Sequence, residues 1–117
     1  MNGLAVFIGG GIGSLLRFGT GKLVASLNMD FPLATFISNI LACLFFVFFL
    51  YLLQRTKTEW LQPFLITGIC GGFSTFSTFS YENYQLIQQG NYLLLVVNVL
   101  LSLMVGIGVF VWLAPKI

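Results

Sequence analysis

Histidine is absent from this chain of 117 residues, and charged residues make up only 7% of it. Soluble domains carry about 25% charged residues, so the composition excludes an ordinary soluble fold. The carboxylates are Asp30, Glu59 and Glu82, and without histidine they provide no general acid–base machinery for an enzyme. Five lysines and arginines are too few for the basic surface of a nucleic-acid-binding protein.

Cysteine is also scarce, and Cys43 and Cys70 both fall within apolar stretches. A cysteine in such a position usually acts as a small hydrophobe. The pair makes neither a disulfide framework nor a zinc pattern. The N-terminus has no basic segment and no small-residue cleavage site, so we expect a retained helix and not a signal peptide.

Apolar sequence is what the chain has in abundance, with 58% hydrophobic residues and a mean hydropathy of +1.00. A membrane span needs about 20 apolar residues to cross a hydrocarbon core of about 30 Å. Four segments meet this length, at about residues 4–27, 33–53, 61–85 and 92–113. Aromatic residues typical of interfacial belts lie near their ends: Tyr51, Trp60, Tyr84, Tyr92 and Trp112. We therefore predict an all-α integral membrane protein, with residues 1–117 forming one four-helix domain.

Positive charge is almost balanced between the two ends of these segments. One side holds Arg55, Lys57 and Lys116, and the other holds Lys22 with Arg17 near the interface. The positive-inside rule relates such an asymmetry to orientation, and this one is too small to fix a single orientation. Weak orientation by the loop after the second segment is one interpretation. Insertion in both orientations, which would allow an antiparallel dimer, is the other.

Residues 71–82 of the third segment carry three interleaved ladders at spacing three. On a helix, residues three apart are surface neighbours. The ladders are Phe73, Phe76 and Phe79; Ser74, Ser77 and Ser80; and Thr75 and Thr78. The pattern predicts an aromatic face beside hydroxylated faces, which suits a narrow polar path through a membrane.

Gly71 and Gly72 lie in the middle of the same segment. Glycine is unfavourable inside helices, and close helix packing through small residues is one interpretation of the pair. A helix break at mid-membrane is the other, since it exposes carbonyls to cations and amides to anions. Ser74 and Thr75 follow at once with hydroxyl groups, so we favour the break.

Phe76 and Phe79 alternate with Ser77, Thr78 and Ser80. The edge of an aromatic ring is positive, so it can approach a small anion without binding it as tightly as a full charge would. A pore needs binding weak enough for release. Core packing is the ordinary role of two phenylalanines, and the alternation with hydroxyls argues against it here.

Polar residues in the second and fourth segments extend this track. Asn39 follows Thr35 by four residues, and Ser102 follows Asn98 by four, so each pair shares a helix face. Gly106 is the next residue at spacing four on the face of Asn98 and Ser102, but it has no side chain. Hydrogen bonding between helices is the alternative role of these groups, but an asparagine NH2 can equally donate to an anion.

Two charged residues lie close to this track. We interpret Arg17 either as a snorkelling residue near a helix end or as part of a positive vestibule that concentrates anions. We expect Glu82, which closes the third-segment run, to cap or pair at the interface rather than to act directly in transport.

Three blocks of the sequence resemble the small fluoride channels of the Fluc family, also called fluoride exporters. Residues 9–18 match a glycine-rich block that ends in arginine and an aromatic residue, and residues 34–39 match a threonine-to-asparagine block. Residues 68–82 match the third-helix block in full, and this block is the most specific. The chain departs from the family pattern at four positions, which are Ala34, Ser38, Asn98 and Gly106.

The resemblance implies an antiparallel dual-topology homodimer with two pores. Pairing with a paralogous subunit is the alternative to a homodimer. It implies passive efflux of cytoplasmic fluoride through the inner (plasma) membrane, among lipid, and hence fluoride resistance. It also implies a structural sodium ion at the centre of the dimer, held by backbone carbonyls at Gly71 and Ser74. The residues it assigns to the fluoride path are Asn39, Phe76, Phe79, Ser77, Thr78, Thr35, Ser102 and Asn98.

Two other functions compete with this interpretation. A small dual-topology multidrug transporter coupled to protons needs a carboxylate deep in its first span, and residues 4–27 contain none. A non-conducting membrane assembly subunit would use the polar ladders only for packing.

Overall fold

The computed structural model describes residues 2–28 and 31–115. Asp30 and Lys116, which the sequence analysis counts among the charges, lie outside these residues. The described part of the chain is helical and contains no strand. Its helices are α1 (Asn2–Ala25), α2 (Leu33–Leu53), η1 (Pro63–Cys70), α3 (Gly71–Phe73), α4 (Phe76–Gln88) and α5 (Tyr92–Leu113).

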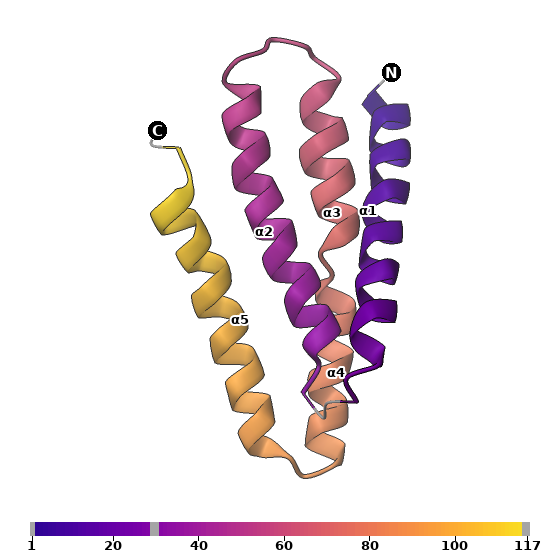
Figure 1. The fold of residues 1–117 in the computed structure, drawn as a ribbon, viewed down its shortest axis with the longest axis vertical. Coiled ribbons are helices and arrows are strands. Elements are labelled where there is room, and N and C mark those ends of the chain that lie inside the picture. The colour runs from indigo at the N-terminus through magenta and orange to yellow at the C-terminus, as the bar shows by residue number, and fades with distance from the viewer. Residues whose placement is uncertain (1, 29–30, 116–117) are drawn as a thin grey trace.

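The helices form an elongated bundle with principal extents of 50 × 29 × 21 Å. α1 packs along η1 and α3, while α2 lies between this pair and α5 (Figure 1). α4 continues beyond α3 toward the lower end, where a turn leads into α5 (Figure 1). Gly90 in this turn has φ 73°, a left-handed conformation that glycine adopts without strain.

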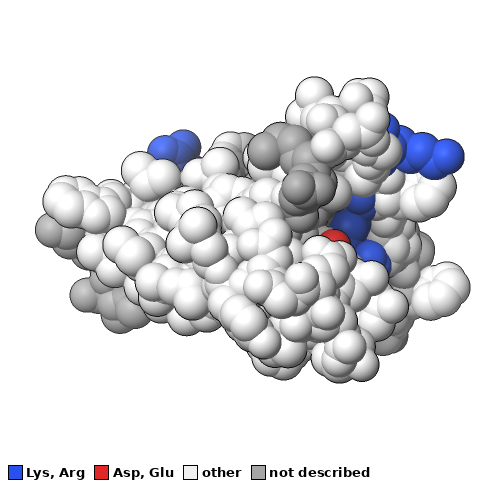
Figure 2. All heavy atoms as spheres, turned by 90° about the horizontal axis from the view of Figure 1, so that it is seen from below, with Lys and Arg blue, Asp and Glu red and all other residues white. Residues whose placement is uncertain are grey.

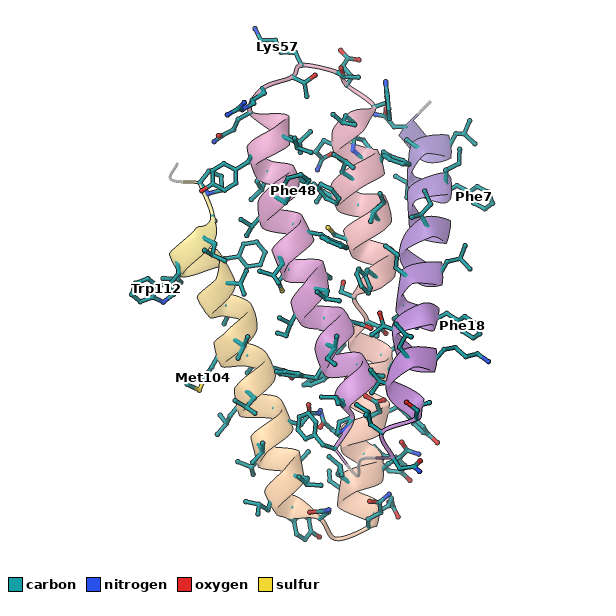
Figure 3. The ribbon with its side chains drawn as sticks, viewed as in Figure 1. Phe7, Phe18, Phe48, Lys57, Met104 and Trp112 are labelled. Carbon is teal, nitrogen blue, oxygen red and sulfur yellow. The ribbon has the colours of Figure 1, made fainter. Side chains whose placement is uncertain are left out.

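The exterior of the bundle is strongly apolar. α1, α2 and α5 are each long and apolar enough to cross a membrane. Phe7, Met104 and Trp112 point away from the bundle (Figure 3) and are 78%, 69% and 84% exposed. Helices that are apolar on all sides without being buried in protein are typical of membrane spans.

The third apolar segment is not one regular helix. Over Pro63–Cys70 the backbone is π-helical, and at its end the N–H of Gly71 donates to the carbonyl of Ile66, five residues earlier. Ser74 and Thr75 are then extended, with φ, ψ of −82°, 156° and −152°, 120°. π-Helical turns are rare and often occur at functional sites, and nothing in our sequence analysis anticipated this one.

The interruption predicted for this segment is present, but it lies a few residues beyond the glycines. Gly71 is helical, with φ −63° and ψ −36°, and Gly72 is used for packing. A β-carbon on Gly72 would lie 2.5 Å from the carbonyl oxygen of Gly10, and one on Gly68 would lie 2.9 Å from the Cα of Gly9. The backbone is thus held against α1 as far as Phe73, and it leaves the helix immediately afterwards.

Glycines on α1 complete this contact, which we call the glycine seam (Gly9, Gly13, Gly68 and Gly72). A β-carbon on Gly9 or Gly13 would collide with the carbonyl oxygen of Phe64 or Ile69, respectively. α1 therefore carries one pair of glycines four residues apart, and the continuous segment η1–α3 carries the other. This spacing lets the backbones of membrane helices approach closely.

The aromatic face predicted for Phe73, Phe76 and Phe79 is wrong for Phe73. Its side chain is only 2% exposed, with its ring 5.7 Å from that of Phe45. Phe76 is 80% exposed, and its ring lies 6.4 Å from the ring of Phe79. The reason is that two extended residues shift the helical phase, so side chains on either side of the break no longer share a face.

Candidate functional site

A groove of about 310 Å³ lies beside the break in the third segment. It is bounded by α2, the start of α4 and α5. Its lining is Asn39, Cys43, Ser74, Thr75, Phe76, Phe79, Ser102 and Leu103. We call it the Asn39 groove. It brings together Asn39, Ser74, Phe76, Phe79 and Ser102, all of which the sequence analysis selected from separate segments.

The amide of Asn39 is oriented by the broken helix. Its Oδ1 accepts a hydrogen bond from the backbone N–H of Thr75 at 2.9 Å. That N–H is free to reach across because Thr75 is extended and precedes α4. Within the described residues the Nδ2 group of Asn39 makes no hydrogen bond, so the groove has an oriented pair of N–H donors in its wall.

The N-terminus of α4 opens on the same groove. Thr75 caps it, since its Oγ1 accepts from the backbone N–H of Thr78 at 3.2 Å and lies 3.4 Å from Ser77 Oγ. The first N–H groups of a helix have no partner inside the helix, and the helix dipole makes this end positive. An anion is therefore favoured here. Ser77 and Thr78 lie beside the groove, and neither is part of its lining.

The C-terminal end of α3 has the opposite polarity. The carbonyl of Cys70 accepts from the N–H of Ser74 at 3.0 Å and from its Oγ at 2.9 Å. The Gly71 carbonyl accepts no such bond within the described residues, because the N–H of Thr75, which would complete the next turn, donates to Asn39. Gly71 and Ser74 are exposed and line a second groove of about 260 Å³. Backbone oxygens at a helix C-terminus suit a hard cation such as sodium, so the residues present fit that ion.

Arg17 does not stand free at a vestibule. Its Nε donates to the carbonyl oxygen of Gly72 at 3.3 Å, one of the carbonyls that the break leaves without a helical partner. The guanidinium thus ties α1 to the C-terminal end of α3. In the view from below, basic atoms lie beside one small spot of acidic atoms at a hollow in the lower end of the bundle (Figure 2).

Thr35 and Glu82 form a contact away from the Asn39 groove. Thr35 Oγ1 donates to Glu82 Oε2 at 3.0 Å, so the partner expected for Glu82 is a hydroxyl and not a cation. Glu82 also lines a hollow of about 320 Å³ beside the end of α1. The other carboxylate oxygen, Oε1, and the hydroxyl of Ser38 are buried without a hydrogen-bond partner within the described residues.

Asn98 is enclosed between α4 and α5 and does not line the Asn39 groove. It is only 1% exposed, and its Nδ2 donates to Oδ1 of Asn83 at 2.8 Å. Ser102 Oγ donates to Oδ1 of Asn98 at 3.4 Å, so the predicted line of polar groups on α5 exists. Asn83 is not among the residues predicted from the sequence. The signal was available, since an asparagine inside an apolar segment requires a hydrogen-bond partner.

A known protein family matches almost the whole of this chain. Residues 4–114 match the family model described as CrcB-like protein, Camphor Resistance (CrcB). The chain belongs to the CrcB family. The match includes both helices that flank the break and every residue of the Asn39 groove.

Individual relatives of this chain share one name. A protein named fluoride-specific ion channel FluC from Azobacteroides pseudotrichonymphae is 50% identical over 106 residues, which are 86% of this chain and 83% of the relative. Proteins of the same name from Flavobacterium psychrophilum and Pyrococcus abyssi are each 43% identical. These alignments cover 87% and 89% of this chain, and 85% of each relative.

Family membership and the apolar helices together establish the class of this CrcB protein. Three of its described helices are suited to crossing a membrane, and its exterior carries large apolar side chains on every long helix. It is a multi-pass membrane protein.

Proposed function

We propose that this chain is the subunit of a passive fluoride channel that lets cytoplasmic fluoride leave the cell and so confers fluoride resistance. The observation that carries the proposal is the convergence at the Asn39 groove of an oriented amide, two phenylalanine rings and a helix N-terminus. Relatives named fluoride-specific ion channels, up to 50% identical, support it. Their class of activity is transport and not enzymatic catalysis.

The chemistry of the groove suits a small, strongly hydrated anion. Burying such an ion is costly unless donors replace its water. Asn39 Nδ2 and the backbone N–H groups of Phe76 and Ser77, which precede the capped Thr78 N–H, are donors without a hydrogen-bond partner within the described residues, and the ring edges of Phe76 and Phe79 add weak positive potential. None of these groups carries a full charge, so binding stays weak enough for the ion to leave.

A second copy in the opposite orientation completes the pathway in this proposal. Phe76 is 80% exposed on the single chain, an unfavourable position for a residue that is to line a dry path unless another surface covers it. The nearly even distribution of lysine and arginine is compatible with insertion in both orientations. The dimer would have two pores, and the third segment would cross the membrane as its two helical parts, giving four spans per chain.

A structural sodium ion at the centre of this dimer is also part of the proposal. The exposed backbone at Gly71 and Ser74 would hold it, using oxygens that receive no hydrogen bond from a helix. When bound, the ion supplies positive charge that offsets the carbonyl ends of the two broken helices.

Efflux from proteoliposomes tests the proposed function. The purified protein is reconstituted with internal fluoride or chloride, valinomycin sets the potential, and a fluoride- or chloride-selective electrode records release. Fast fluoride release with negligible chloride release is expected. No fluoride release from assembled dimers would contradict the proposal and favour a non-conducting assembly subunit.

Two phenylalanine variants assign the conducting path in the same assay. Phe76→Ile and Phe79→Ile are expected to abolish or strongly reduce fluoride flux while the dimer stays assembled. Phe48→Ile is the matched control, since Phe48 on α2 is 56% exposed and lies outside the Asn39 groove. Normal flux through both groove variants would contradict the role given to the ring edges.

A further inference from the structure

We infer that the half-buried Asn83 and the buried Asn98 form a positioning pair that controls the hydroxyl of Ser102 in the Asn39 groove. Asn83 thereby becomes a further determinant of anion permeation. The inference rests on the proposed channel function and extends it to a residue outside the groove.

The pair is held firmly. Asn98 Nδ2 donates to Asn83 Oδ1 at 2.8 Å, and the Asn98 side chain is 1% exposed. A hydrogen bond in such an apolar surrounding is strong, and an amide left there without a partner is costly. Asn98 is therefore fixed in one orientation, with its Oδ1 turned toward Ser102.

The contact between Asn98 and Ser102 is weaker. Ser102 Oγ lies 3.4 Å from Asn98 Oδ1, near the upper limit for a hydrogen bond. A serine hydroxyl has one proton, so while it donates to Asn98 it cannot donate to an anion in the groove. The strong bond holds the acceptor in place, and the weak bond can exchange.

This arrangement makes Asn98 and an anion compete for one proton. An anion that enters the groove draws the Ser102 hydroxyl away from Asn98, and when the anion leaves, the hydroxyl returns. The competing acceptor lowers the net affinity of Ser102 for the anion. Weak binding of this kind is what rapid conduction requires.

The position of the pair on the two helices supports this role. Asn83 follows Phe79 by four residues on α4, and Asn98 precedes Ser102 by four residues on α5. Each asparagine thus lies one turn from a residue of the groove. Because the extended backbone of Ser74 and Thr75 separates α4 from α3, α4 depends on lateral contacts, and the asparagine pair is one of them.

Concentration-dependent flux tests the inference in the full-length protein. Fluoride efflux from proteoliposomes is measured over a range of fluoride concentrations for wild type, Asn83→Ala, Asn98→Ala and Ser102→Ala. Loss of the competing acceptor in Asn98→Ala is expected to lower the half-saturating fluoride concentration and to reduce the maximal flux about tenfold. Asn83→Ala, which removes the hydrogen bond that holds Asn98, is also expected to lower the half-saturating fluoride concentration and the maximal flux.

A double-mutant cycle shows whether Asn83 acts through Ser102. In the Ser102→Ala background, Asn83→Ala is expected to cause no further change in half-saturation or maximal flux. Gln85→Ala, at an exposed position two residues along α4, is the matched control and should leave flux at the wild-type level. Independent, multiplicative losses in the double variant would overturn the inference.

Assembly is followed by size-exclusion chromatography on the same samples. If Asn83→Ala does not assemble, Asn83→Asp keeps the accepting oxygen in place, and wild-type half-saturation in that variant supports the inference. A lowered half-saturating concentration in Asn83→Asp would overturn it. If the wild type conducts fluoride and Asn83→Ala has the same half-saturation and maximal flux, this inference is overturned but the proposed function is not. If the wild type does not conduct, both the proposed function and this inference are overturned.

Discussion

The side-chain oxygen of Asn39 accepts a hydrogen bond from the backbone N–H of Thr75 at 2.9 Å, which joins α2 to the point where the third segment leaves the helix. This bond satisfies a backbone group that the break exposes. It also turns the Asn39 NH2 group away from Thr75, so one contact supports both the fold and the proposed anion site.

Substitution of Asn39 separates these two roles. Asn39→Asp keeps an acceptor for Thr75 but replaces the NH2 donors with a negative oxygen, so we expect an assembled dimer without fluoride flux. Asn39→Leu leaves the Thr75 N–H unpaired, and we expect a loss of stability of about 1–3 kcal/mol. Proteoliposome efflux and thermal unfolding in detergent measure the two effects. Wild-type flux through Asn39→Asp would remove Asn39 from the pathway.

Arg17 allows charge and hydrogen bonding to be distinguished. Arg17→Lys keeps the positive charge but loses the Nε donor to Gly72. If anchoring is its main role, we expect Arg17→Lys to lower stability by about 1 kcal/mol, a value reduced for partial exposure, and to lower flux equally at low and high salt. A purely electrostatic vestibule predicts near-normal flux in Arg17→Lys and a flux that falls with salt in the wild type. Lys22→Gln on the same helix is the control for charge alone.

The glycine seam sets the distance between α1 and the broken segment. In Gly13→Ala the new methyl group would meet the carbonyl of Ile69, and in Gly72→Ala that of Gly10. We expect each change to destabilise the protein by about 1–3 kcal/mol, as overpacking does, measured as a fall in unfolding temperature. Gly19→Ala on α1 is the control, because a β-carbon there has no neighbour within 4 Å. Equal unfolding temperatures for Gly13→Ala and Gly19→Ala would contradict the seam.

Two hydroxyls on α2 are expected to respond to removal with opposite signs. The Ser38 hydroxyl is buried without a partner, so Ser38→Ala should leave stability unchanged or raise it by about 1 kcal/mol. Thr35 donates to Glu82, so Thr35→Val leaves a carboxylate oxygen unpaired and should lower stability by about 1–2 kcal/mol. Thermal unfolding of the two variants side by side measures this difference, and destabilisation by Ser38→Ala would indicate a partner for its hydroxyl.

Much of the architecture could be predicted from local sequence. α2 and α5 cover Leu33–Leu53 and Tyr92–Leu113, the ranges of the second and fourth apolar segments, because length and hydropathy are properties of consecutive residues. The interruption of the third segment follows from hydroxyl-bearing residues placed after a pair of glycines. The lines of polar residues at spacing four, such as Asn98 and Ser102, follow from the helical period alone.

The contacts that define the site depend on the tertiary structure. Glycine spacing alone did not show that Gly72 would pack against Gly10 and thereby move the break to Ser74 and Thr75. The pairing of Arg17 with Gly72 spans 55 residues, and that of Asn39 with Thr75 spans 36. Inside an apolar bundle a polar group must bond to whichever partner the packing of the helices brings near it. The sequence by itself determined which residues are polar and which helix face they share, and only the packing of α1, α2 and α5 around the broken segment decided their partners.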